Sequence, residues 1–142
     1  MSEFPREIDV PPGVEAGVWA NDVEAFGDLE DVTITNLSMR DITNAPIYLR
    51  HGGRLRAPEG TKVGNFRRVT ISNVRIHGAP AEQSVIIAGI PDHPIEDLKL
   101  DNIAIVYEGG GTKEMASTRP SDRVTDYPEP QNHGPMPAYG FF

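Results

Sequence analysis

Three stretches of the chain repeat one order of apolar and polar positions: residues 29–39, 66–76 and 95–105. Each begins with a large apolar residue and has further apolar residues at its fourth and sixth positions. An asparagine follows at the eighth position, and apolar residues return at the ninth and eleventh. The stretches start 37 and then 29 residues apart. Repeats of this size predict a solenoid, in which each unit buries its apolar face against its neighbours.

The spacing within each repeat predicts a strand, a corner and a second strand. Before the asparagine, apolar residues alternate with polar ones, which is typical of a strand with one buried face. After the asparagine the alternation slips by one position, and such a slip indicates a corner. Asparagine suits a corner because it tolerates the left-handed backbone conformation. We therefore expect Asn36, Asn73 and Asn102 to be structural residues that form a ladder of stacked amides.

Short apolar segments between the repeats predict a further strand in each turn. Residues 46–50 and 84–88 follow the first two repeats at similar offsets, and residues 17–21 have the same character one turn earlier. Three short strands per turn, without helical periodicity, predict an all-β fold. We expect a parallel β-helix of about three to four turns with irregular capping termini. The alternative is an antiparallel β-sandwich, in which the repeat is a coincidence of strand composition.

Length and composition narrow the class of protein. A chain of 142 residues is expected to form one domain. We divide it into an N-terminal arm or cap (residues 1–16), the β-helix turns (17–108) and an irregular C-terminal loop packed on them (109–142). The net charge of −8 argues against nucleic acid and membranes as partners. The chain has no cysteine and four scattered histidines, so we expect neither a metal site nor a cofactor.

The sequence leaves the compartment open. No apolar run is long enough to span a bilayer. The first residues lack the basic and apolar regions of a signal peptide. As written, the chain is expected to stay in the cytoplasm or to be part of something larger.

Six further segments carry recognisable sequence motifs, which follow one another along the chain: residues 43–50, 53–61, 87–97, 107–112, 127–130 and 137–142. Together they resemble the polygalacturonase-like glycoside hydrolases, glycoside hydrolase family 28, over roughly residues 17–142. The resemblance implies a right-handed parallel β-helix and the cleavage of pectic polymers by inverting hydrolysis. It also implies a secreted or periplasmic location, which is common in that family.

The active site of that family has no counterpart in this sequence. The resemblance implies four motifs there: Asn-Thr-Asp, an Asp-Asp pair, Gly-His-Gly and Arg-Ile-Lys. None of the four occurs, and Arg75-Ile76-His77 only mimics the last. Inverting hydrolysis needs an acid on the leaving oxygen and a carboxylate that activates water, about 6.5–9.5 Å apart. The chain therefore resembles the C-terminal portion of such an enzyme without its catalytic turns.

One dense basic cluster interrupts the acidic sequence. If residues 47 and 49 point into the core, alternation places Tyr48 and Arg50 on the outside, followed by His51 and Arg54. Arginine pairs well with carboxylates such as those of uronic acids, and an exposed tyrosine can stack on a sugar. Trp19 would lie one turn earlier on the same sheet. These residues are the candidate carbohydrate-binding site. The alternative is that they are solvated loop charges and a core or capping tryptophan.

Three functions are consistent with these features. The first is a non-catalytic β-helix module with weak affinity for acidic oligosaccharides. The second is an active glycosidase that cleaves polygalacturonate-like polysaccharide with other carboxylates, such as Asp22, Glu24 or Asp92, or with a site completed by a second subunit. The third is a structural or assembly protein. The missing motifs favour the first. A short solenoid with open ends is also expected to form homo-oligomers through its ends or faces.

Overall fold

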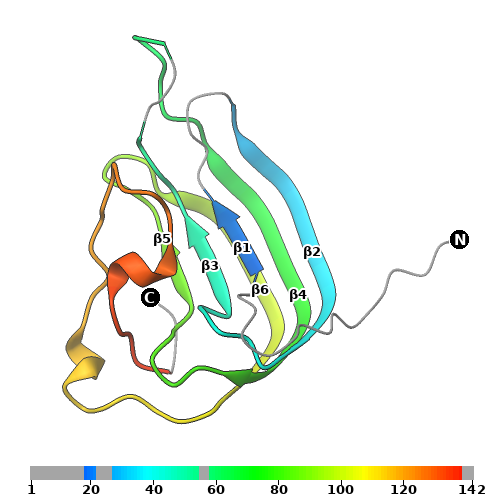
Figure 1. The fold of residues 1–142 in the computed structure, drawn as a ribbon. Helices are drawn as coiled ribbons and strands as arrows, with labels where there is room; N and C mark the ends of the chain where they lie inside the picture. The colour runs from blue at the N-terminus through cyan, green and yellow to red at the C-terminus, as the bar shows by residue number, and fades with distance from the viewer. Residues whose placement is uncertain (1–17, 22–26, 55–57, 139–142) are drawn as a thin grey trace, which may run out of the picture.

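The computed structural model describes residues 18–21, 27–54 and 58–138 (Figure 1). Within these residues the chain is all-β, with short 3-10 helices and no α-helix. The elements are β1 (Val18–Asn21), β2 (Leu29–Arg40), β3 (Ile47–Arg50), β4 (Phe66–Ala79), β5 (Ile86–Ala88), β6 (Ile95–Tyr107), η1 (Met115–Ser117) and η2 (Pro130–His133). No helix in this part of the chain is long and apolar enough to cross a membrane. The arm or cap assigned to residues 1–16 lies outside the described residues.

The strands form two parallel sheets to which the chain contributes in turn (Figure 1). The shorter sheet has the order β1-β3-β5 and the longer sheet the order β2-β4-β6. Neighbours in one sheet are therefore separated in sequence by a strand of the other. All of the paired strands run parallel. The antiparallel sandwich is wrong, and the prediction of an all-β protein with parallel strands is confirmed.

The three sequence repeats are the three strands of the longer sheet. Leu29 of β2 lies opposite Phe66 of β4, which lies opposite Ile95 of β6. The other apolar positions pair in the same way, so the inner face of the sheet consists of apolar rows. Side-chain matching sets this register rather than loop length, because the repeats start 37 and then 29 residues apart.

The asparagine column kinks the strands without ending them, which differs from the corner that the sequence predicted. Asn36, Asn73 and Asn102 have φ angles of 60°, 55° and 53°, in the left-handed region. Strand pairing skips these residues and resumes at the next one, so β2, β4 and β6 continue through the column. The kink ends no strand because all three strands bend at the same place and keep their hydrogen bonds to one another.

The main core lies between the two sheets and is tightest around the central strand. Ile47 and Leu49 of the shorter sheet point into it and belong to one apolar cluster with the inner face of the longer sheet. Most inner residues of β2 and β6 are only half-buried; the exception is Met39 of β2, which is 5% exposed. Those of β4 are at most 1% exposed: Phe66, Val69, Ile71, Val74 and Ile76. The two outer strands therefore leave their apolar rows partly open.

Part of the C-terminal segment packs on the outer face of the shorter sheet (Figure 1). Met136 joins Tyr48 in a second apolar cluster on that face. The backbone N–H of Gly53 donates to the carbonyl of Val124 at 2.8 Å. The N–H of Met136 donates to the carbonyl of Glu82 at 3.0 Å. We call residues 123–136 the covering segment; residues 139–142 lie outside the described residues.

Candidate functional site

The covering segment buries the cluster that the sequence placed on an open surface. Tyr48 and Arg50 point away from the main core, but they are 0% and 1% exposed. His51 is also 1% exposed. The expectation of an exposed tyrosine and arginine is therefore wrong. Alternation predicts toward which face of a strand a side chain points. It does not predict whether a segment distant in sequence packs on that face.

Polar contacts join the covering segment to the cluster. The Tyr48 hydroxyl and His133 Nε2 lie 3.2 Å apart in a hydrogen bond. Arg50 donates to the carbonyl oxygen of Arg123, while its Nη1 has no hydrogen-bond partner within the described residues. Burial, followed by the charges of Arg50 and Arg123, lowers the pKa of His133 to about 4. The ring of His133 is therefore neutral at pH 7.

The other two candidate residues are Arg54, which follows β3, and Trp19, which lies in β1. Arg54 is half-buried, and its guanidinium carbon lies 4.9 Å from the centre of the Tyr127 ring. Trp19 lies in β1, with its backbone opposite Tyr48 in the parallel register. While the covering segment is in place, Tyr48 and Arg50 offer no open surface to a polysaccharide. A role of this cluster in carbohydrate binding stays a prediction.

The outer face of the longer sheet carries its polar side chains in rows that cross the strands. In one row, Arg67 Nε donates to Glu30 Oε2 at 2.7 Å, and Arg68 Nε donates to Asp31 Oδ1 at 2.7 Å. The hydrogen bond from Arg67 lowers the pKa of Glu30, and that from Arg68 lowers the pKa of Asp31. The hydrogen bonds to both carboxylates raise the pKa of Arg68. The positive charges of both arginines in this row are therefore already paired with carboxylates.

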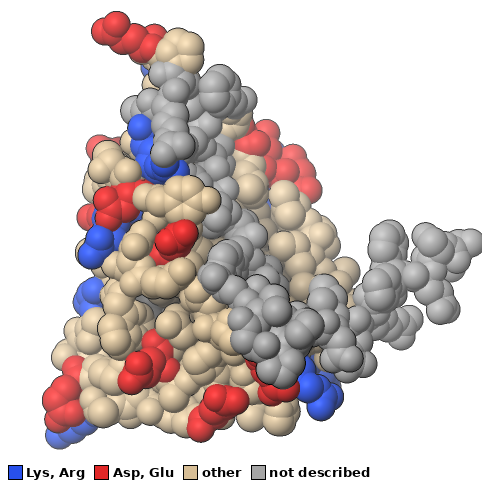
Figure 2. All heavy atoms as spheres, viewed as in Figure 1, with Lys and Arg blue, Asp and Glu red and all other residues tan. Residues whose placement is uncertain are grey.

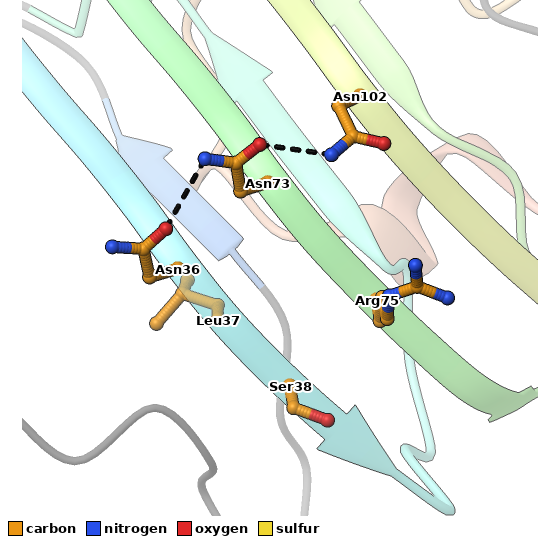
Figure 3. A pocket seen from close by; sticks show the side chains of 6 residues that line it. All are labelled: Asn36, Leu37, Ser38, Asn73, Arg75 and Asn102. Atoms are coloured by element: carbon orange, nitrogen blue, oxygen red, sulfur yellow. Dashed lines mark hydrogen bonds between the residues drawn. The ribbon is translucent and has the colours of Figure 1, made fainter.

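A second row on the same face is the ladder of asparagines (Figure 3). Asn102 Nδ2 donates to Asn73 Oδ1 at 2.8 Å, and Asn73 Nδ2 donates to Asn36 Oδ1 at 3.2 Å. Beside the ladder, Ser72 Oγ donates to Thr35 Oγ1 at 2.9 Å. Because Asn73 both donates and accepts, it fixes the orientation of the amides on either side. The ladder is thus an ordered polar floor on an exposed face.

Two adjoining hollows open beside the ladder, and we call them together the groove. The first, of about 330 Å³, is lined by Asn36, Leu37, Ser38, Asn73, Arg75 and Asn102 (Figure 3). The second, of about 310 Å³, is lined by Ser38, Met39, Arg40, Arg75, Ile76, His77, Ala104 and Val106. Because Ser38 and Arg75 line both hollows, the groove runs across the sheet face at these two residues.

Arg75 is the central charge of the groove. In the strand register it lies between Ser38 of β2 and Ala104 of β6, two small residues that leave room on both sides of the guanidinium. Arg75 is exposed and has no ion-pair or hydrogen-bond partner within the described residues. Arg40 and His77 lie toward one end of the groove, and its lining within the described residues holds no carboxylate. The groove can therefore accept an anion.

Sequence reasoning missed Arg75 as a binding residue and treated it only as the mimic of a catalytic motif. A signal was present in the repeats. When the three repeats are aligned, Arg67 and Arg68 fall beside acidic residues, whereas Arg75 falls beside a serine and an alanine. An arginine without an acid at the same repeat position is expected to lack an ion pair across the strands.

The other residues considered as chemistry do not gather into a site. Asp92 is exposed in a tight turn closed by backbone hydrogen bonds between Ile90 and His93. Asp22 and Glu24 lie outside the described residues. In the part of the chain that the structure describes, no group of three or more His, Cys, Asp or Glu could hold a metal ion.

Comparisons of the chain with protein-family models, with curated proteins and with solved structures found no match. The resemblance to the polygalacturonase-like glycoside hydrolases therefore rests on the motifs of the sequence and stays a prediction.

Proposed function

We propose that the chain is a right-handed parallel β-helix module of the polygalacturonase-like type, which binds acidic oligosaccharides in the groove without cleaving them. The alternate addition of strands to two parallel sheets supports the β-helix, because a chain that coils in one sense produces this order. The right hand follows the general rule for connections between parallel strands.

The observation that carries the binding proposal is an unpaired arginine in the groove of an acidic protein. The chain has a net charge of −8, and acidic side chains are spread over the face drawn in Figure 2. Arg67 and Arg68 illustrate the usual outcome, since each is paired with a carboxylate on the next strand. Arg75 has no such partner in the described part of the chain. Its planar fork suits a carboxylate, which it can bind through two parallel hydrogen bonds.

The remainder of the groove suits a sugar that carries this carboxylate. The amides of the ladder and the hydroxyl of Ser38 can exchange hydrogen bonds with sugar hydroxyls. Ala104 and Val106, the latter 50% exposed, offer apolar contact to the C–H face of a ring. Each hollow is at the lower end of the size range of small-molecule sites. We therefore expect a short uronic-acid oligosaccharide and weak affinity.

We assign binding and not hydrolysis to this chain because the described lining of the groove lacks the carboxyl groups that hydrolysis requires. Inverting hydrolysis requires two carboxyl groups on opposite sides of the bond that is cleaved. The groove lining within the described residues holds none, and the sequence lacks the four motifs of the family.

Titration calorimetry with trigalacturonate tests the proposal. We expect binding by the wild-type chain and a loss of about tenfold in affinity for Arg75→Ala, since one charge-assisted hydrogen-bond pair is removed. Arg75→Lys should keep part of the affinity because it keeps the charge but not the fork. The matched control is Arg67→Ala, which removes an arginine of the same strand that is already paired with Glu30.

Three results would each contradict part of this proposal. Equal binding by wild type and Arg75→Ala would exclude the groove; if Arg54→Ala alone abolished binding, the site would be the basic cluster near the covering segment. Equal binding of the fully methyl-esterified trisaccharide would show that no carboxylate is recognised. Release of reducing sugar from polygalacturonate by the wild-type chain would contradict the absence of hydrolysis.

A further inference from the structure

The outer strands of the longer sheet both carry a pair of adjacent acids in the register of the paired arginines. Glu30 of β2 lies opposite Arg67 of β4, which lies opposite Glu96 of β6. The next residue of each strand has a positive φ angle and is acidic on β2 and β6 but basic on β4. We name these pairs the β2 doublet (Glu30 and Asp31), the β4 doublet (Arg67 and Arg68) and the β6 doublet (Glu96 and Asp97).

The β4 doublet forms its ion pairs on one side only. Its two arginines contact the β2 doublet at 2.6 to 2.7 Å. The acids of the β6 doublet are exposed and have no ion pair within the described residues. The doublet on β6 therefore repeats the arrangement that β2 presents to β4, but its own arginine pair is missing.

The edge of β6 is also open in its backbone and its apolar side chains. Within the described residues β6 pairs with β4 alone, so the hydrogen-bonding groups on its other side face no strand. Its inner side chains, such as Leu98 and Leu100, are half-buried, whereas Val69 and Ile71 beside them on β4 are at most 1% exposed. A further parallel strand would bury this row as β6 buries that of β4.

A second copy of the chain does not fit this edge. Continuing the register, the β6 doublet of one copy would lie against the β2 doublet of the next, with Glu96 beside Glu30 and Asp97 beside Asp31. Like charges directly opposite each other on neighbouring strands are destabilising. The open ends that led us to expect end-to-end homo-oligomers therefore carry charges that oppose this contact.

We propose that the β6 edge docks a parallel strand of a different polypeptide, one that carries two adjacent basic residues in the register of the β4 doublet. The strand fits as β4 fits β2: an apolar residue, the basic pair, then apolar residues alternating with polar ones. Asn102 adds a second marker of register. Its Nδ2 is engaged with Asn73, and its Oδ1 faces outward to accept from an asparagine at the same position of the added strand. This inference does not depend on sugar binding.

A labelled peptide with the sequence of residues 65–79 supplies such a strand as a probe. Fluorescence anisotropy with the full wild-type chain should show binding at least about tenfold tighter than that of a control peptide carrying Arg67→Glu and Arg68→Asp. The Glu96→Arg/Asp97→Arg variant should reverse the preference, which assigns the effect to β6. Arginine is accommodated at position 97, because Arg68 has the same conformation at the equivalent position, with φ angles of 55° and 49°. High salt should shrink the preference.

Sedimentation velocity gives the matching test of self-association. The wild-type chain should stay monomeric at low salt, whereas Glu96→Arg/Asp97→Arg should form head-to-tail oligomers, since its β6 edge then complements the β2 doublet of the next copy. The proposal is overturned if neither peptide binds, if both bind equally, or if the preference is unchanged in the variant. It is also overturned if the wild type oligomerises as strongly as the variant, which would make a second copy the occupant.

Discussion

Left-handed residues occur at stacked positions of the three long strands, and each costs conformational energy that its side chain must offset. One column is Asn36, Asn73 and Asn102; a second, five residues earlier, is Asp31, Arg68 and Asp97. For most residues the left-handed conformation costs roughly 1–2 kcal/mol, and after glycine it is asparagine and aspartate that adopt it most readily. In the first column the amide hydrogen bonds offset this cost, and between β2 and β4 the second column uses ion pairs.

Replacing the central asparagine separates the two contributions. We expect Asn73→Ala to lower the free energy of unfolding by about 2 kcal/mol, because it removes both amide hydrogen bonds and leaves a residue that disfavours a positive φ angle. Asn73→Gly loses the same hydrogen bonds but accepts the backbone conformation, so it should cost about half as much. Urea unfolding of the three proteins measures both values. No loss in Asn73→Ala would show that the ladder does not stabilise the fold.

The two columns also show what the sequence could reveal at this scale. The asparagine column is visible because one residue type recurs at the same repeat position and the alternation slips there. The other column has aspartate, arginine and aspartate. An arginine at a φ angle of 55° has no local signature. Its conformation is shared with Asp31 and Asp97 at the same register position of the two neighbouring strands. The information that sets it therefore lies in the assembled sheet and not in the sequence around Arg68.

At the scale of elements, the covering segment converts the outer face of the shorter sheet into a second interior. Tyr48 meets His133 across 85 residues of sequence, and Arg50 meets Arg123 across 73. Strand alternation predicted which way Tyr48 and Arg50 point. It could not predict their burial, because the covering segment has no strand periodicity and its contacts with β3 are distant in sequence.

The buried histidine makes this cover sensitive to acid. His133 is faced by Tyr48 and Arg50 on β3 and by Arg123 and Asp126 of its own segment. Its pKa is lowered from 6.5 to about 4 in the folded chain, so the unfolded chain binds the proton more tightly. The stability that His133 contributes is therefore complete above pH 6.5 and is lost as the pH falls toward 4. Hydrogen exchange of residues 123–136, expressed as protection factors relative to the intrinsic rate at each pH, should show lower protection at pH 5 than at pH 7.

A matched pair of variants isolates this effect. His133→Gln can still hydrogen-bond the Tyr48 hydroxyl but does not titrate, so the protection factors of its segment should be similar at the two pH values. His77→Gln, on the open face of the longer sheet, should behave like wild type. Burial also lowers the pKa of His51, which directly follows β3, so some acid sensitivity at the end of β3 will remain in His133→Gln. If the covering segment of His133→Gln loses as much protection in acid as that of the wild type, His133 is not the source of the acid sensitivity.

At the scale of the whole molecule, the longer sheet is close-packed at its central strand and more open at its two outer strands. One row across the longer sheet contains Ile34, Ile71 and Leu100 in register. Ile71 is fully buried, whereas Ile34 and Leu100 are half-buried. The central strand β4 has two neighbours in this sheet, and each outer strand has one within the described residues.

This gradient can be measured by truncating one row of side chains. Replacing a buried Ile or Leu with Ala costs about 2–5 kcal/mol, and more where the cavity cannot collapse. We expect Ile71→Ala to lie at the upper end of that range and Ile34→Ala and Leu100→Ala to cost about half as much, as measured by urea unfolding. If Ile71→Ala does not fold, Ile71→Val against Ile34→Val gives the same comparison at about 1 kcal/mol. Equal losses of unfolding free energy across the row would contradict the gradient, because they would mean that the outer strands β2 and β6 are covered in solution. If the loss of unfolding free energy in Leu100→Ala rises when the basic 65–79 peptide is added, the added strand covers β6.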